Sequence, residues 1–275
     1  MIEALQFEFM QNALMAAMLA SIACGVIGSL VVVNRIVFLS GAVAHAAYGG
    51  LGLASFMGWP VLPCAVGFSV AASGAMASVT ARNMQQADSI IGVMWAGGMA
   101  LGMILLDFTP GYNVDLMSFL FGSILAVPTQ DLWLMAGLDV LILCVTLTLY
   151  KDFEAMSYDG AFAGVRGVPV VALHFVLLAM IGASVVMVIR VVGLILVIAL
   201  LSIPPGIVVH RAPSLFSMMW RAALLAAGFC VAGLALAYVF DLTSGAAIIA
   251  VAVVVYAVCG LGARVQKRRA MKRLE

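Results

Sequence analysis

Charged residues are scarce in this sequence: Asp, Glu, Lys and Arg make up only 9% of its 275 residues. A soluble domain carries about 25%, so this chain cannot form a water-facing surface of the usual size. Hydrophobic residues make up 65%, and the mean hydropathy is +1.22. The lipid bilayer must therefore be the solvent for most of the chain.

Several functional motifs are also missing. No stretch matches GxxxxGK[ST], the phosphate-binding loop of many ATPases. We therefore expect a non-enzymatic chain that binds no cofactor, with any ATP used by a partner subunit. The five cysteines lie in apolar stretches without CxxC or CxH spacing and are interpreted as small buried hydrophobes. Glu3 and Glu8, without Lys or Arg, precede the first apolar run, which favours a retained span over a cleaved signal peptide.

Long apolar runs dominate what is present. At roughly 20 apolar residues per helix, they predict an all-α, polytopic membrane protein with eight or nine transmembrane helices in a single domain over 1–275. The predicted spans are 9–33, 36–58, 60–80, 89–108, 131–150, 168–189, 191–209, 215–239 and 244–262. Between 109 and 130, the apolar LMSFLFGSILAV is too short to cross and predicts a re-entrant or interfacial half-helix.

Lys and Arg residues indicate the orientation, because cytoplasmic loops are enriched in them. If the 151–167 loop is cytoplasmic and the spans alternate, every Lys and Arg except Arg190 falls on the cytoplasmic side. This favours nine spans in the inner (cytoplasmic) membrane, an outside N-terminus and a cytoplasmic C-terminus. The basic tail 264–275 is then predicted to lie at the anionic inner leaflet. A single span over 168–209 would reverse the tail and is disfavoured.

Two ionisable residues lie deep in predicted spans, where such groups usually mark a pathway. His45 lies in SGAVAHAAYGGLG, whose small residues let helices approach closely or leave room for an ion. Neutral imidazole is a common ligand of divalent transition metals, so His45 is a candidate metal contact; the alternative is a hydrogen bond to a carbonyl. Asp139 is either a cation-attracting carboxylate or a protonated carboxyl bonded to another helix.

The longest polar loop, KDFEAMSYDGAFAGVRG over 151–167, has apolar residues at intervals. A short amphipathic helix from Phe153 to Val165 would place Phe153, Met156, Phe162 and Val165 as apolar points. Such a helix suits docking into a groove on a soluble partner. The alternative is a solvated connection.

Five stretches, in this order, resemble the permease family of zinc, manganese and iron ABC transporters. They are GVIGSLVVVNRIVFLSGAVAHAAYGGLGLA, DSIIGVMWAGGMALGMILL, DLMSFLFGSILAVPTQDL, FEAMSYDGAFAGVRGVPV and RVVGLILVIALLSIPPGIVV. The segment TSGAAIIAV near the C-terminus fits as well. The likeness runs along most of the chain.

The resemblance implies a permease that forms a translocation path, in a homodimer or with a second permease subunit. Its implied partners are two cytoplasmic ATPase subunits and an extracytoplasmic metal-binding protein, with no nucleic acid. The loop 151–167 corresponds to the segment that couples to the ATPase. Its candidate contact residues are Phe153, Tyr158, Phe162, Ala163 and Gly164.

His45 corresponds to the histidine of the family's Gly-Asp-Ala-x-x-His stretch, which is implicated in the cation path. The aspartate of that stretch is replaced here by Gly41, so the acidic partner of His45 is missing. The family's Ile-Pro-Ala-Ala becomes Ile203-Pro204-Pro205-Gly206, and two adjacent prolines should break that span sharply.

Three functions remain open at this point. The first is the permease of an ATP-driven importer for Zn²⁺, Mn²⁺ or Fe²⁺. The second is a permease of the same family that moves a metal chelate, which the loss of the acidic residue favours. The third is a secondary cation transporter that uses His45 and Asp139 as a relay. It would need inverted repeats, and the two halves show no convincing self-similarity.

Overall fold

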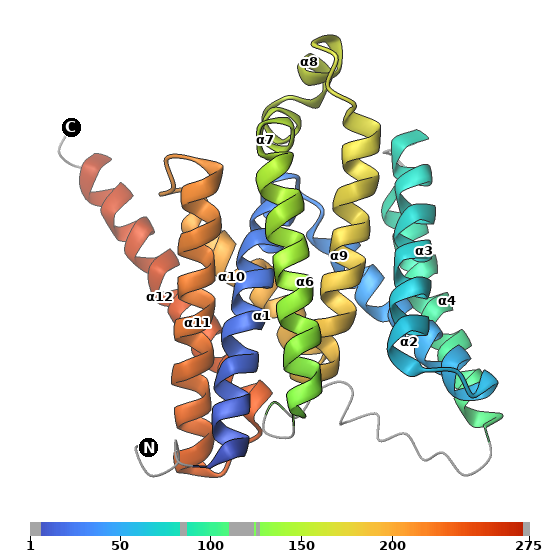
Figure 1. The fold of residues 1–275 in the computed structure, drawn as a ribbon. Helices are drawn as coiled ribbons and strands as arrows, with labels where there is room; N and C mark the ends of the chain where they lie inside the picture. Colours follow the sequence, from blue (N-terminus) through green and yellow to red (C-terminus); the bar gives the residue numbers. More distant parts are fainter. Residues whose placement is uncertain (1–6, 83–86, 110–123, 125–126, 272–275) are drawn as a thin grey trace.

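The computed structural model describes residues 7–82, 87–109, 124 and 127–271, and every element within these residues is a helix (Figure 1). The longer helices are α1 (Glu8–Val33), α2 (Val37–Met57), α3 (Val61–Arg82), α4 (Ala87–Asp107), α6 (Thr129–Thr148), α9 (Val170–Val192), α10 (Leu194–Val208), α11 (Leu215–Phe240) and α12 (Ser244–Met271). Two short helices, α7 (Tyr150–Tyr158) and α8 (Gly160–Val165), connect α6 to α9.

Seven of these helices are long and apolar enough to cross a membrane: α1, α2, α3, α6, α9, α11 and α12. Two shorter apolar helices, Ile91–Asp107 within α4 and Leu194–Val208, correspond to the remaining predicted spans. The prediction of a polytopic, all-α membrane protein is confirmed. Most of the predicted half-helix between 109 and 130 lies outside the described residues.

The 168–209 region is two helices. Gly193 separates α9 from α10 and has a φ of 87°, a left-handed backbone value that glycine adopts without steric cost. The single span over 168–209 is therefore excluded. The basic segment after 263 is helical as far as Met271, because α12 continues through it.

Helix α10 corrects the expectation that its two prolines break the span. Pro204 and Pro205 both lie inside a continuous helix. Pro205 has no N–H to donate to the Leu201 carbonyl, but that carbonyl faces α1 at Gly28, where an added Cβ would lie 2.5 Å from the Leu201 oxygen. Helix α1 thus packs closely against this carbonyl, and the Val209 N–H continues the helical pattern by donating to the Pro205 oxygen at 2.8 Å.

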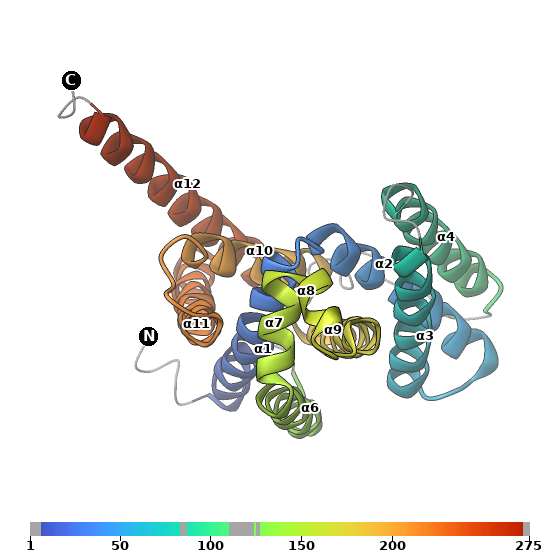
Figure 2. The ribbon, with the colours of Figure 1, turned by 90° about the horizontal axis from the view of Figure 1, so that it is seen from above.

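The helices differ greatly in how deeply they are packed. Buried residues make up 72% of the most apolar stretch of α1, which contacts α11, α10 and α6, but only 22% of that of α12. Helix α9 lies between α6 and the group formed by α2, α3 and α4 (Figures 1 and 2). Helix α12 projects from the opposite side, packed mainly on α10 and α11 (Figure 2).

Several basic segments meet at one end of the molecule. Helices α7 and α8 lie at this end together with the C-terminal end of α12, opposite the start of α1 (Figure 1). The Asn34 amide donates to Ser157 Oγ at 2.9 Å, which brings the Arg35 turn to α7. The Phe216 N–H donates to the Tyr150 hydroxyl at 3.2 Å, which brings the start of α11 there too. One end therefore gathers Arg35, Lys151, Arg166, Arg211 and Arg221.

Candidate functional site

The α2–α4 pair forms the tightest helix contact around a candidate site residue. A Cβ added at Gly98 of α4 would lie 2.7 Å from Ala46 Cα, and Gly52 and Gly102 meet backbone to backbone. Without a hydrophobic drive between helices in lipid, small residues permit this close van der Waals packing. The two helices therefore hold the side chains between them in fixed positions.

His45 lies in this contact and is only 8% exposed. Its ring stacks on Trp95 of α4, with 4.3 Å between ring centroids and 18° between planes. Its Nδ1 lies 3.1 Å from Met99 Sδ, also of α4. This is a hydrogen-bond distance, and whether Nδ1 donates to the sulfur depends on the tautomer of the imidazole.

Trp95 and Met99 were not identified from the sequence. They are one helical turn apart, so they share a face of the span, but no sequence signal assigns that face to His45. Conversely, the expectation of open space around His45 is wrong for Gly49 and Gly50. A Cβ at Gly49 would lie 2.9 Å from the Phe68 ring, and one at Gly50 would lie 2.8 Å from Ala65 Cα. These two glycines let α3 pack closely against α2.

Gly41, which occupies the family's acidic position, has more space around it than Gly49 and Gly50. It precedes His45 by one helical turn and so shares its face. A Cβ there would meet only Ile198 Cδ1, at an ordinary 3.9 Å. The backbone at this position therefore has room for a larger side chain.

Asp139 lies elsewhere. Its side chain on α6 is buried, 5% exposed, and its Oδ2 has no hydrogen-bond partner within the described part of the chain. Helix α6 packs mainly on α1, and α9 stands between it and the α2–α4 pair (Figure 2). The structure thus does not bring His45 and Asp139 together as a relay. Among the described residues, no three His, Cys, Asp or Glu gather to hold a metal ion.

The 151–167 segment forms two helices where one was expected. Asp159 has extended backbone angles and accepts the Phe162 N–H at 3.0 Å, so it caps the start of α8. Phe153 is fully buried in the core and Ala163 is 2% exposed. Their side chains pack inside the permease and present no surface to a partner, and the ATPase contact of the segment stays a prediction.

The other side chains of this segment face outward. Tyr158 is 77% exposed, Phe162 59% and Val165 88%. A Cβ added at Gly164 would meet nothing within 4 Å. The Arg166 guanidinium lies 5.4 Å from the centre of the Phe162 ring, a cation–π contact. This exposed set on α7 and α8 is large and apolar for the polar end of a membrane protein, which is typical of a docking surface.

Comparison with known families gives a match over residues 6–261 to the ABC 3 transport family. The chain belongs to this family. It is therefore the non-catalytic membrane subunit of an ABC transporter, and the resemblance to metal-ion ABC permeases is confirmed. Membership also removes the secondary-transporter hypothesis.

Its relatives cover nearly the whole chain. The uncharacterized membrane protein slr2045 of Synechocystis is 52% identical over 93% of this chain and 91% of its own length. The manganese transport system membrane protein MntC of Halalkalibacterium halodurans is 30% identical over 92% of this chain and 87% of its own. The solved PsaBC complex of Streptococcus pneumoniae superposes with a TM-score of 0.84 at 28% identity, covering 94% of this chain and 93% of that one.

Proposed function

We propose that this chain forms the translocation path of an importer for a divalent transition metal, with His45 as a transient contact on that path. The observation that carries the proposal is the buried His45–Met99 pair, whose donor atoms lie 3.1 Å apart. Two weak donors suit conduction, because an ion held by a complete cage would not leave.

The donor chemistry supports Zn²⁺ or Fe²⁺ over Mn²⁺. Imidazole ligands suit zinc, iron and copper, and thioether ligands suit zinc and copper, whereas carboxylate oxygens suit manganese. The names of two relatives, MntC and ScaB, describe manganese transport or import by those proteins. This chain has Gly41 at the family's acidic position, and Met99 supplies the second donor next to His45.

The partners follow from the two ends of the molecule. The exposed surface on α7 and α8 fits a cytoplasmic ATPase subunit in two copies, and a second copy of the permease completes the path. An extracytoplasmic metal-binding protein then delivers the ion at the end where α1 begins. The basic segments at the α7–α8 end support a cytoplasmic position for that end and for the C-terminus.

The test uses whole-cell uptake of radiolabelled Zn²⁺, Fe²⁺ and Mn²⁺ by cells that express the complete transporter. Loss of one donor contact, about 1.4 kcal/mol, lowers the rate about tenfold, so His45→Ala should lower uptake by about that factor without changing expression or basal ATPase activity. His45→Gln keeps a hydrogen-bonding group but not an imidazole, and should remain impaired. Full uptake by the Gln variant would show that His45 is structural.

The docking surface has its own test. Gly164→Glu places a bulky charge on the exposed face of α8, where there is space for it, and should abolish transport while the protein still inserts. Ala161→Glu places the same charge at a second exposed position of α8. Comparing the two variants shows whether the effect depends on the position of the charge. Normal uptake and ATPase stimulation in Gly164→Glu would remove the docking role.

Transport of a metal chelate is the second candidate, favoured by the missing carboxylate at Gly41. Competition separates the two: excess free Zn²⁺ should block uptake of the radiolabelled ion, whereas a chelate permease would take up the metal only with its chelator. Uptake that depends on added chelator would replace the first proposal with the second.

A further inference from the structure

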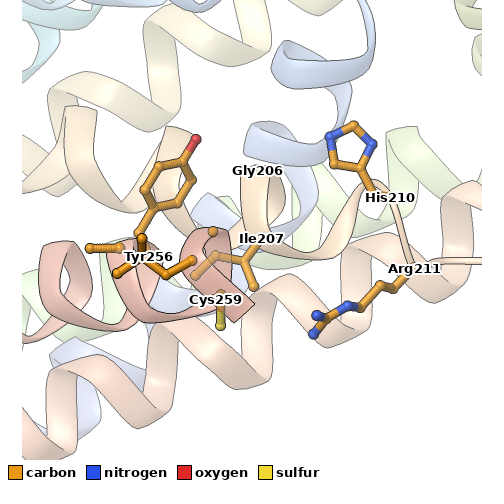
Figure 3. Close-up of a pocket in the computed structure, with 9 residues that line it drawn as sticks. Gly206, Ile207, His210, Arg211, Tyr256 and Cys259 are labelled. Carbon is orange, nitrogen blue, oxygen red and sulfur yellow. The ribbon is translucent and has the colours of Figure 1, made fainter. Parts of the chain in front are cut away.

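A cavity of about 540 Å³ lies between the end of α10 and the later part of α12. Figure 3 shows His210 and Arg211 on the α10 side and Tyr256 and Cys259 on the α12 side, with Gly206 and Ile207 between them. A Cβ added at Gly206 would lie 3.7 Å from Tyr256 Cε2, so the tyrosine ring lies close over the α10 backbone. The volume falls within the range of small-molecule sites, about 300–1,000 Å³.

The lining combines an apolar wall with basic groups at one side. Ile207, Ala257 and Leu261 supply the apolar wall, and His210 and Arg211 supply nitrogen donors. None of the described residues that line the cavity carries a carboxylate. Such a lining fits a ligand that has both an anionic group and an apolar chain.

A second guanidinium lies next to Arg211. Arg221 of α11 donates from Nη1 to the Arg211 carbonyl oxygen at 3.1 Å, which holds its guanidinium next to this residue of the cavity lining. Across the described residues, neither arginine forms an ion pair with a carboxylate. Guanidinium groups are well suited to phosphate oxygens, which they can bind in a bidentate manner.

The cavity also adjoins an exposed apolar helix surface. It lies toward the end that carries α7 and α8, where a lipid headgroup would meet basic residues. The adjoining α12 surface is apolar and bare: Val254, Val258 and Leu261 are 60–61% exposed. Further Lys and Arg follow in the sequence of α12 and the tail, namely Arg264, Lys267, Arg268, Arg269, Lys272 and Arg273. Basic pockets between helices at the inner leaflet are typical sites for anionic phospholipids.

We propose that the α10–α12 cavity binds an anionic phospholipid, with its phosphate at Arg211 and its acyl chain along Ile207 and Leu261. The proposal rests on the proposed cytoplasmic position of this end, but not on the transported metal. The bound lipid would attach α12, which packs mainly on α10 and α11, more firmly to the rest of the bundle.

Native mass spectrometry of the full chain, with phosphatidylglycerol or phosphatidylcholine added, tests the site directly. Each basic residue near a membrane surface contributes about 1 kcal/mol toward anionic lipid, or about fivefold in binding. We therefore expect at least fivefold more bound phosphatidylglycerol than phosphatidylcholine, and about a fivefold loss in Arg211→Gln. Lys151→Gln, which removes an exposed charge at the same end outside the cavity, should bind like wild type.

A steric variant tests the cavity without touching the charges. Gly260 lines it, and a Cβ there meets nothing within 4 Å, so Gly260→Leu should fold and displace the acyl chain. Gly262→Leu on the same helix has similar open space but lies outside the cavity, and should retain the lipid. Both variants are compared by bound lipid and by the thermal stabilisation that phosphatidylglycerol gives.

Three results would overturn the proposal. Equal retention of the two lipids would show that the cavity does not recognise the headgroup. Equal thermal stabilisation by inorganic phosphate would show a site for a free anion. A dimer that Gly260→Leu dissociates, with no lipid bound, would show that a second copy of the chain fills the cavity.

Labelling of Val165→Cys and Leu242→Cys with an impermeant thiol reagent, in a background without the native cysteines, checks the orientation separately. These measurements do not involve transport, so they fail or succeed independently of the proposed function.

Discussion

The α2–α4 pair and the α10–α12 pair use glycine in opposite ways. Between α2 and α4, Gly98 and Gly102 bring two backbones into contact and hold His45 against Trp95 and Met99. Along α12, Gly260 faces open space at the edge of a cavity. One pair is closed around a candidate ion contact, and the other is open to the surroundings.

The difference shows how a membrane protein controls rigidity with the same residue type. In lipid, helices associate through close van der Waals packing and not through hydrophobic burial. Small residues that face a neighbouring helix therefore give a fixed site. Small residues with no neighbouring helix leave a gap that lipid or another chain can fill. The fixed pair suits ion recognition, and the open pair suits an adjustable contact.

The largest expected effect comes from disturbing the closed pair. Gly98→Ala would place a methyl group 2.7 Å from Ala46 Cα, and backbone on both sides cannot move away easily. Overpacking of this kind costs about 1–3 kcal/mol, so the melting temperature of the purified protein should fall by several degrees. The adjacent Gly97→Ala meets nothing within 4 Å and is the matched control. Equal melting temperatures for the two variants would mean that α2 and α4 are not in close contact.

A smaller effect is expected from restoring the family's acidic residue on α2, one turn from the closed pair's His45. Gly41→Asp adds a carboxylate one turn before His45, where a Cβ meets only Ile198 Cδ1. Because carboxylate oxygens favour manganese, the ratio of Mn²⁺ to Zn²⁺ uptake should rise by about fivefold, the equivalent of 1 kcal/mol. Gly41→Ala, which adds only the methyl group, should leave the ratio unchanged. An unchanged ratio in Gly41→Asp as well would place the ion path away from this face of α2.

Met99 should have a more modest effect. Met99→Leu keeps the size of the side chain but removes the sulfur that lies 3.1 Å from His45 Nδ1. A thioether is a weak ligand, so Zn²⁺ uptake should fall by about two- to threefold, less than 1 kcal/mol, while Mn²⁺ uptake changes less. Size-exclusion profiles of the purified protein check that the volume-conserving change leaves the fold intact. A loss equal to that of His45→Ala would indicate a structural defect.

The sequence was sufficient to predict the spans. The spans predicted at 9–33 and 215–239 correspond to the helices Glu8–Val33 and Leu215–Phe240. A backbone in lipid must satisfy its hydrogen bonds within the helix, so the length and hydropathy of an apolar run are enough to predict the helix. Candidate His45 was also found from the sequence, since an imidazole in mid-span is conspicuous.

The partners of these residues could not be predicted, because they depend on which helix faces meet. Phe153 and Phe162 lie nine residues apart in one segment, yet one is buried and the other exposed. The reason is the helix break at Asp159, which changes the direction of the chain and cannot be read from apolar spacing. Similarly, the Pro204–Pro205 pair suggested a break, but contact with α1 at Gly28 depends on tertiary packing.

The smallest expected effect lies in the open pair. Gly260→Ala adds a methyl group that meets nothing within 4 Å, so no contact is lost. Alanine favours the helical backbone over glycine by up to about 1 kcal/mol, and the melting temperature should rise slightly. Gly233→Ala is the informative contrast, since Gly233 of α11 packs directly against the Ile248 backbone of α12 and its substitution should be destabilising. Thermal unfolding in one detergent, without added lipid, measures both variants. A decrease for Gly260→Ala comparable to that for Gly233→Ala would show that α12 packs tightly along its whole length, and the contrast between the two helix pairs would then disappear.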